Sequence, residues 1–180
     1  DGYRNGFRVC SVCGFADVID SSVKQKPARE HTNPLTHAKC TGAFESYDLG
    51  HHFMTDVLQL RFELPFRDES AIQSLLYAIL NGASDALEIP REDIGGLVFY
   101  PDGKPSLLLY DTTPGGSGHV EMIDHQLRQA LEGALKRVEH CDGCGRDTSC
   151  YSCLRGYDNQ SVHDLLVRGT AADLLEQILR

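Results

Sequence analysis

The sequence has no tryptophan, only two methionines and no long hydrophobic run. No apolar stretch approaches the roughly 18 residues that a membrane-spanning helix needs, so we expect no membrane segment. The Walker phosphate-binding motif, the Gly-x-Ser-x-Gly turn of serine hydrolases and the His-Glu-x-x-His motif of zinc proteases are also missing. These absences argue against a membrane protein, an ATPase that works alone and the common hydrolase classes.

The sequence also has no excess of basic residues: its formal net charge is −9 at pH 7. Such a charge argues against a broad phosphate-binding surface. The distribution is uneven, since the first 40 residues contain six basic and four acidic side chains. If any part of the chain contacts nucleic acid, this segment is the better electrostatic candidate.

Cysteine is abundant, with seven residues in two clusters. Near the C-terminus, Cys141-Asp-Gly-Cys144 is followed by Cys150-Tyr-Ser-Cys153. Two Cys-x-x-Cys pairs this close together can supply four thiolates to one tetrahedral ion, and soft thiolates favour Zn²⁺. The alternative is a pair of disulfides, which an odd number of cysteines and the lack of a secretion signal disfavour. We therefore predict a four-cysteine zinc knuckle.

A second cluster lies at the other end of the chain. Cys10-Ser-Val-Cys13 resembles a zinc-ribbon knuckle, and His37-Ala-Lys-Cys40 could complete a site of three cysteines and one histidine. His31 is a rival for the fourth position, and free thiols are the alternative to a metal site. Neither cluster leaves an open coordination position. The sequence thus predicts one structural Zn²⁺ ion at the C-terminal cluster and allows a second at the N-terminal one.

Hydrophobic periodicity divides the chain into two parts and predicts an α+β fold. Residues 1–48 are expected to form a zinc-ribbon-like module, and residues 49–180 a small antiparallel or mixed sheet packed with helices and ending in the four-cysteine knuckle. The expected elements are a strand over 53–64, a helix over 70–88, strands over 97–100 and 106–111, a helix over 119–138, and short helices starting near 161 and 170. The helix over 70–88 is expected to start with a Ser70–Gln73 capping box and to be weakened in its middle by the Asn81-Gly82 pair.

A glycine-rich segment follows the strand that ends at Asp111. Thr-Thr-Pro-Gly-Gly-Ser-Gly118 lies between this strand and a helix, where free backbone N–H groups can hold an anion. The other interpretation, which we favour, is that the glycines permit close packing of helix and sheet. Asp56, His51, Asp111 and His119 are the polar residues from which a cryptic hydrolase or nuclease would be built. No complete catalytic set is recognisable, so we expect this part of the protein not to be an enzyme by itself.

Three motifs carry a resemblance to a known family. They are Leu49-Gly-His-His-Phe-Met-Thr-Asp56, Tyr110-Asp-Thr-Thr-Pro-Gly-Gly-Ser-Gly118 and the C-terminal knuckle with its continuation Cys153-Leu-Arg-x-Tyr-x-Asn159-Gln160. In this order they resemble the MrfA-type zinc-binding domain of mitomycin repair factor A helicases, long catalogued as a domain of unknown function. The resemblance extends over about residues 8–175. The sequence is also similar to the domain found in the B component of DISARM phage-defence systems.

The resemblance implies a cytoplasmic bacterial or archaeal protein, of which this chain is the C-terminal part. The preceding part would be a superfamily 2 ATP-dependent DNA helicase, active in DNA repair or in phage defence. Partners would be the helicase motor domains, in the same chain or in another subunit, and DNA bound by the full-length protein. The family's four cysteines correspond to Cys141, Cys144, Cys150 and Cys153. The domain would couple the motor domains to DNA as a zinc-binding accessory.

Overall fold

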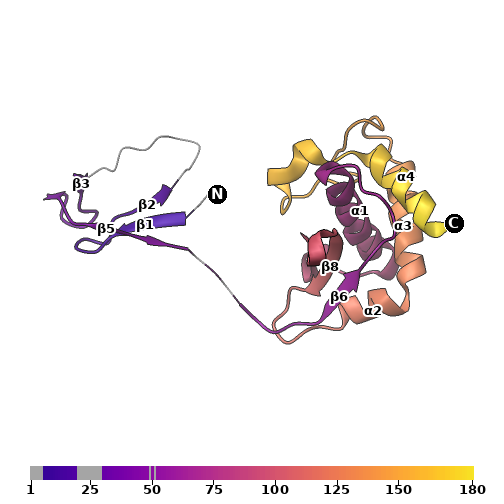
Figure 1. Cartoon of the computed structure of the whole chain (residues 1–180), viewed down its shortest axis with the longest axis horizontal. Helices are drawn as coiled ribbons and strands as arrows, with labels where there is room; N and C mark the ends of the chain where they lie inside the picture. The colour runs from indigo at the N-terminus through magenta and orange to yellow at the C-terminus, as the bar shows by residue number, and fades with distance from the viewer. Residues whose placement is uncertain (1–5, 20–29, 49, 51) are drawn as a thin grey trace. The chain divides into compact units, whose positions relative to one another are not determined.

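The computed structural model describes residues 6–19, 30–48, 50 and 52–180. The chain divides into an N-terminal unit, residues 1–52, and a C-terminal unit, residues 53–180. Figure 1 shows strands alone in the described part of the N-terminal unit, and strands with helices in the C-terminal one. The predicted α+β class is confirmed. Each unit is described by itself below.

The N-terminal unit is a small β structure with little hydrophobic core. A three-stranded antiparallel sheet has the order β2-β1-β5, and β3 and β4 form a separate two-stranded pair. Among residues 6–19 and 30–48, Cys10 is the only buried hydrophobic side chain. The strands are β1 (Gly6–Cys10), β2 (Ala16–Ile19), β3 (His31–Thr32), β4 (Lys39–Cys40) and β5 (Phe44–Tyr47).

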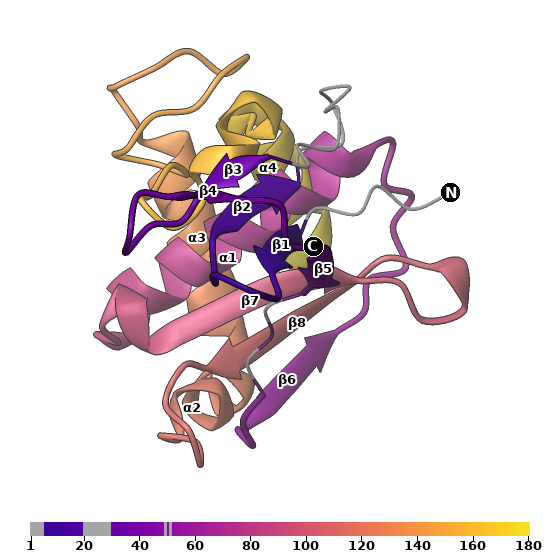
Figure 2. The same cartoon turned by 90° about the vertical axis from the view of Figure 1, so that its left-hand side faces the viewer.

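The C-terminal unit packs helices against one face of an antiparallel sheet with the order β6-β8-β7. Figure 2 shows these three strands side by side. The strands are β6 (Val57–Leu60), β7 (Ile94–Phe99) and β8 (Ser106–Asp111). The helices are α1 (Glu69–Leu87), α2 (His119–His125), α3 (Leu127–Glu139) and α4 (Arg168–Leu179), with 3₁₀ turns η1 (Arg91–Asp93), η2 (Pro101–Gly103) and η3 (Gln160–Leu165).

The hydrophobic core of the C-terminal unit lies between α1, the sheet and α3 and α4. Alternate residues of β8 point into it, so Leu107 and Leu109 are fully buried while Leu108 and Tyr110 are on the other face. From α1, Leu75 and Ile79 are also fully buried. Burial of such side chains stabilises the fold by about 1.5–3 kcal/mol each. The core therefore extends up to the knuckle, where Cys153 and Leu154 join it.

The N-cap of the first long helix lies two residues before Ser70, the N-cap that the predicted capping box implied. This N-cap is Asp68, whose Oδ1 accepts a hydrogen bond from the Ala71 N–H at 2.9 Å. Ser70 instead donates to the Leu165 carbonyl at 2.6 Å, and so ties α1 to η3. Aspartate and serine are equally good caps, so the pattern alone could not decide between them.

Two other predicted elements are shorter or divided. The predicted strand 53–64 forms a strand only over Val57–Leu60. Before it, Met54 and Thr55 bond to the end of β8 and the glycine-rich segment: the Met54 carbonyl accepts from Gly115 N–H at 2.7 Å, and Thr55 Oγ1 donates to the carbonyls of Asp111 and Thr113. The predicted helix 119–138 is divided at Gln126 into α2 and α3. The predicted strands 97–100 and 106–111 correspond to β7 and β8, which pair as an antiparallel hairpin; β7 starts at Ile94 and lies at the edge of the sheet.

The Asn81-Gly82 pair does not break α1. A Cβ atom on Gly82 would lie 2.2 Å from the backbone of Ala134, so this glycine lets α3 approach α1 closely. The adjacent Asn81 is buried and bonds to the knuckle. The pair is a packing and hydrogen-bonding site rather than a weak point. In the described part of the chain, no helix is both long and apolar enough to cross a membrane.

Candidate metal centres

The C-terminal cluster follows directly on the end of α3. Cys141 comes two residues after Glu139, the last residue of α3, and Cys150–Cys153 forms a tight turn in which the Cys150 carbonyl accepts from the N–H groups of Cys153 and Leu154, both at 3.1 Å. Cys141 and Cys153 are buried, and Cys144 and Cys150 are half-buried. Local sequence thus places all four thiols at one end of the helical layer.

The four sulfurs have the spacing of a tetrahedral metal site. Sγ–Sγ distances are 3.9 Å for Cys141–Cys144, 3.5 Å for Cys141–Cys150, 3.7 Å for Cys144–Cys153 and 3.9 Å for Cys150–Cys153. Sulfurs placed about 2.3 Å from one tetrahedral ion lie about 3.8 Å apart. A disulfide needs about 2.05 Å, and all seven cysteines are free thiols. The donor set therefore fits Zn²⁺ and not two disulfides.

The backbone at Gly143 is adapted to this spacing. A Cβ atom there would lie 2.8 Å from Cys150 Sγ and 3.7 Å from Cys141 Sγ. Burial raises the pKa of Cys153 to about 12, while at Cys150 burial is outweighed by hydrogen bonds from Cys141 and the Ser152 backbone, which hold the pKa at about 7. Thiols in such a crowded, buried group need a cation if all four are to ionise.

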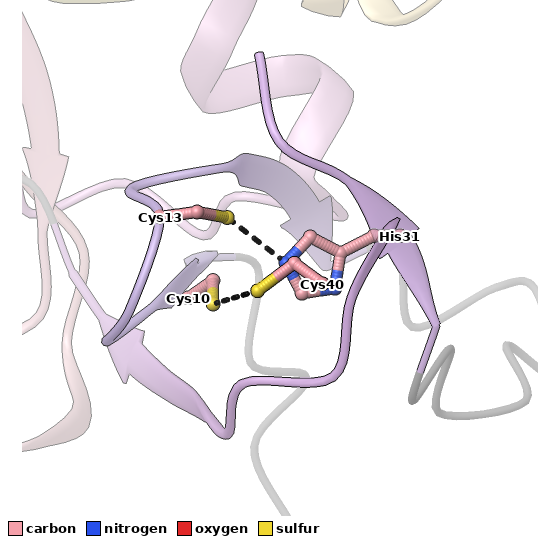
Figure 3. Close-up of side chains that lie close together, drawn as sticks. All are labelled: Cys10, Cys13, His31 and Cys40. Atoms are coloured by element: carbon pink, nitrogen blue, oxygen red, sulfur yellow. Dashed lines mark hydrogen bonds between the residues drawn. The ribbon is translucent and has the colours of Figure 1, made fainter. Parts of the chain in front are cut away.

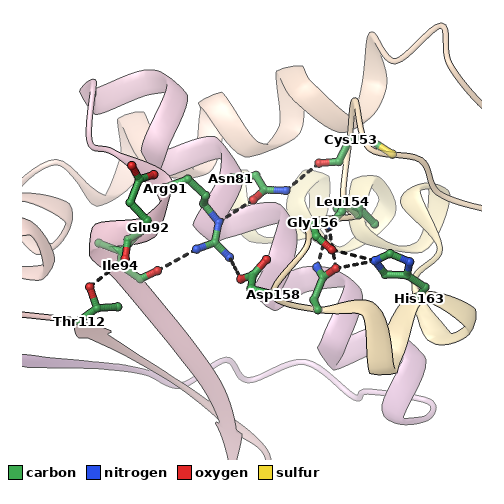
Figure 4. Close-up of polar contacts among 11 residues, drawn as sticks. Asn81, Arg91, Glu92, Ile94, Thr112, Cys153, Leu154, Gly156, Asp158 and His163 are labelled. Carbon is green, nitrogen blue, oxygen red and sulfur yellow. Dashed lines mark hydrogen bonds and ion pairs between the residues drawn. The ribbon is translucent and has the colours of Figure 1, made fainter.

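Two side chains from the helices hold the Cys153 end of the knuckle. The Cys153 carbonyl accepts from Asn81 Nδ2 on α1 and from Arg137 Nε on α3, both at 2.9 Å. Figure 4 shows how Asn81 continues this contact: its Oδ1 accepts from Arg91 Nε at 2.8 Å, and Arg91 also donates to the Ile94 carbonyl and to Asp158. The knuckle is thereby connected to the start of β7.

The chain after the knuckle is fixed by a buried asparagine. Asn159 Nδ2 donates to the Leu154 carbonyl at 2.9 Å, and its Oδ1 accepts from the Gly156 N–H at 2.8 Å. His163 Nε2 lies 2.8 Å from the same Oδ1. This gives a structural reason for the Asn159 of the recognised motif. Asn81, Arg137 and Arg91 were not found from the sequence, because nothing in its pattern marks a contact that α1 and α3 make only after packing.

The N-terminal cluster brings together Cys10, Cys13, His31 and Cys40, whose ligand atoms lie within 4.8 Å of one another (Figure 3). Cys10 Sγ is 3.8 Å from Cys40 Sγ, and Cys13 Sγ is 3.1 Å from His31 Nε2. The rings of Phe15 and Phe44 pack on His31, with centroid distances of 5.2 and 4.8 Å. Three sulfurs and one imidazole form a common structural zinc donor set.

His31, the rival ligand, occupies the position that His37 was predicted to take. In the pair of β3 and β4, His31 is directly opposite Cys40. His37 lies in the connecting turn with φ of 57° and an exposed side chain, and its N–H donates to the Asn33 carbonyl. The His37-x-x-Cys40 spacing is that of a zinc knuckle, but the pairing of β3 with β4 places His31, nine residues before Cys40 in the sequence, beside Cys40 instead.

Backbone N–H groups point at the sulfurs of the N-terminal cluster. Val12 N–H donates to Cys10 Sγ and Gly42 N–H to Cys40 Sγ, both at 3.4 Å. Burial by itself would raise the pKa of Cys10, but hydrogen bonds from the backbone of Cys13 and Val12 outweigh it and lower the pKa to about 6. These N–H groups stabilise negative charge on sulfur, as a thiolate ligand requires.

The residues considered for catalysis do not form a comparable centre. Asp111 is fully buried, and its carboxylate accepts from the N–H groups of Ser117 at 2.6 Å, His119 at 3.2 Å and Val120 at 3.0 Å. His119 Nε2 lies 3.5 Å from Asp93, and Asp56 is exposed beside the backbone of Gly116. His51 lies outside the described residues. The anion cradle of the glycine-rich segment is filled by the protein's own carboxylate.

The family model of the MrfA Zn-binding domain matches residues 75–154. The match contains all four cysteines of the C-terminal cluster, so the predicted resemblance is confirmed. The chain is also 32% identical over 205 residues to the Druantia protein DruE of Escherichia coli (strain UMEA 4076-1). That alignment covers 99% of this chain and 11% of the relative.

Solved structures of the DUF1998 helicase MrfA share the fold. The complex bound to DNA matches with a TM-score of 0.59 and 18% identity, over 83% of this chain and 20% of that chain. The complex bound to DNA and AMPPNP matches with a TM-score of 0.52 and 16% identity, over 81% of this chain and 18% of that chain. The chain thus corresponds to a small part of each of these longer proteins.

Proposed function

Because residues 75–154 match the MrfA Zn-binding domain, we propose that Cys141, Cys144, Cys150 and Cys153 bind a structural Zn²⁺ ion. We propose a second ion for the N-terminal cluster, with His31 as the fourth ligand. Both sites have four protein donors and leave no position for substrate, so the role of each ion is to fix the backbone. A reducing cytoplasm would keep the thiols available as ligands.

We further propose that the chain is an accessory module of a longer ATP-dependent DNA helicase and couples the motor domains to DNA. The observation that carries this proposal is the fold shared with MrfA over 83% of the chain, together with the zinc-domain match. The 32% identity with a Druantia protein over nearly the whole chain favours phage defence over DNA repair as the setting. The geometry supports a rigid element rather than a reaction centre.

The proposal is tested on the full-length protein that contains this chain. We expect Cys144→Ser to lower duplex strand separation by about tenfold or more, because the loss of one zinc ligand loosens the knuckle. ATP hydrolysis without DNA should stay close to the wild-type rate, since the chain contains no nucleotide-binding motif. Strand separation and ATP hydrolysis are measured on the same preparations.

Ser152→Ala is the matched control, because Ser152 lies between two ligands, is exposed and offers no sulfur. This variant should separate strands like the wild type. Unchanged strand separation by a Cys144→Ser protein that has lost its zinc would refute the coupling role. Loss of DNA-independent ATP hydrolysis in the same variant would show that the module supports the motor itself rather than its coupling to DNA.

A further inference from the structure

One buried arginine holds the half of the C-terminal cluster that Asn81 and Arg137 do not reach. Arg168, the first residue of α4, is 9% exposed. Its Nη1 donates to the Val138 carbonyl at 2.6 Å, and its Nε and Nη2 donate to the Cys144 carbonyl at 3.2 and 3.0 Å. Nε also donates to the Gly145 carbonyl at 3.1 Å. Three carbonyl oxygens thus converge on one guanidinium.

These carbonyls belong to segments that must be fixed together if the sulfurs are to converge. Val138 is in the last turn of α3, where carbonyls have no partner within the helix, and Cys144 is the second ligand of the first knuckle. The distance between these segments determines where Cys141 and Cys144 point. A guanidinium is a planar fork of donors with fixed directions, so it sets both distance and angle, which a lysine cannot do.

The backbone around Arg168 strengthens this arrangement. Its N–H donates to the Thr148 carbonyl at 3.0 Å, and the Gly169 N–H donates to the Arg146 carbonyl at 2.9 Å. A Cβ atom on Gly169 would lie 2.5 Å from that carbonyl oxygen. The start of α4 is therefore pressed against the loop that connects the two knuckles.

The charge of Arg168 also needs an explanation. In the described part of the chain, its side chain forms no ion pair with a carboxylate. A buried charge is costly unless an opposite charge lies near it. Four thiolates and one Zn²⁺ carry a net charge of about −2, and Arg168 binds the carbonyl of Cys144, one of these four cysteines.

We propose that Arg168 is the positioning residue of the C-terminal zinc site and the buried counter-charge of its zinc–thiolate cluster. It acts through the carbonyls of Val138, Cys144 and Gly145, and does not touch the metal. The inference rests on the proposed zinc binding by the four cysteines, but not on the proposed coupling to a helicase.

The test uses the whole chain with Cys10→Ser and Cys13→Ser, so that only the C-terminal site remains. Zn²⁺ affinity is measured by competition with a chromogenic chelator, and the geometry of the site by the absorption spectrum of the Co²⁺-loaded protein. Arg168→Gln removes the charge and the fork, and Arg168→Lys keeps the charge alone. Arg128→Gln is the matched control, because it removes the same charge and fork of donors from an arginine on α3 whose side chain is 73% exposed and pairs with Glu132.

We expect Arg168→Gln and Arg168→Lys each to lower Zn²⁺ affinity about 10–100-fold and to alter the Co²⁺ spectrum, while the control behaves like the parent. Full affinity in the lysine variant would overturn the positioning role. An unchanged Co²⁺ spectrum with lower occupancy would overturn it too, because simple destabilisation of the fold has that signature. A parent protein that binds no Zn²⁺ would instead refute the proposed metal site itself.

Discussion

At the scale of single residues, Asp111 shows how a polar group that looks catalytic serves the fold. It ends β8, and the glycine-rich segment curls round its carboxylate so that three backbone N–H groups point at it. Gly115, Gly116 and Gly118 have φ between 80° and 93°, which this curl requires. The carboxylate thus takes the place that a bound phosphate would have at the start of α2.

We expect Asp111→Asn to lower the free energy of unfolding by about 1.5–3 kcal/mol, the range for hydrogen bonds to a charged group. The amide has only one acceptor oxygen, so its NH₂ group would face backbone N–H donors. Chemical denaturation at neutral pH measures the effect. The control Asp56→Asn changes an exposed carboxylate and should alter stability by less than about 0.5 kcal/mol.

The pH dependence of this effect follows from the direction of the Asp111 pKa shift. Burial would raise its pKa, but hydrogen bonds from Ser117 and Val120 outweigh burial and lower it below the ordinary value. A lowered pKa in the folded state gives stability that is present above the unfolded pKa of about 3.9 and is lost as the pH falls through the folded pKa. The difference between wild type and Asp111→Asn should therefore stay constant from about pH 5.5 to 8. A difference that disappears within this window would contradict the assignment.

At the scale of elements, the close crossing of α1 and α3 positions the metal cluster. Gly82 on α1 faces the backbone of Ala134, and a Cβ atom on Gly133 of α3 would lie 2.8 Å from the Gly82 carbonyl oxygen. Small residues at the crossing let the two backbones touch, so that Asn81 and Arg137 can both reach the Cys153 carbonyl. The spacing of two helices is thereby transmitted to a sulfur ligand.

We expect Gly82→Ala to lower the free energy of unfolding by about 1–3 kcal/mol, even though alanine favours a helix by about 1 kcal/mol over glycine. The added methyl group would force α3 away from α1 and weaken both bonds to the Cys153 carbonyl. Thermal unfolding and Zn²⁺ release should therefore change together. Glu132→Ala, next to Gly133 on the exposed face of α3, should change neither. A stabilised Gly82→Ala protein would show that the helices can separate without cost.

Local patterns predicted most elements and the four-cysteine cluster, because helix periodicity and Cys-x-x-Cys spacing are properties of neighbouring residues. They failed where the outcome depends on pairing between distant segments. His31 is next to Cys40 only once β3 pairs with β4, and Arg168 reaches Cys144 only once α4 packs on α3. Asn81-Gly82 was interpreted as a weak point because Cys153 and Ala134, which contact Asn81 and Gly82, lie more than 50 residues further along the chain. Contacts of this kind need the tertiary structure.

At the scale of the whole molecule, we expect the two units to depend on their proposed metal sites to different degrees. The hydrophobic core cluster extends from Leu60 to Leu175 and lies wholly in the C-terminal unit. The described part of the N-terminal unit has only Cys10 among its buried hydrophobic side chains. A unit with so little apolar burial cannot offset the conformational entropy of folding without further constraints. We therefore expect metal binding at the proposed sites to supply most of the stability of the N-terminal unit and a smaller share of that of the C-terminal unit.

We expect a chelator that removes all zinc to unfold the N-terminal unit and to leave most of α1, β7 and β8 folded. Hydrogen exchange followed by mass spectrometry measures this, with fast exchange predicted over 6–19 and 30–48 and, in the C-terminal unit, over the knuckle residues 140–156. His31→Ala should reproduce the N-terminal loss alone and lower zinc content from two ions to one, because each site supports its own unit. His37→Ala is the matched variant and should keep both ions, since its side chain lies in the turn away from the sulfurs. Protection that persists over residues 6–19 and 30–48 without zinc would contradict this division.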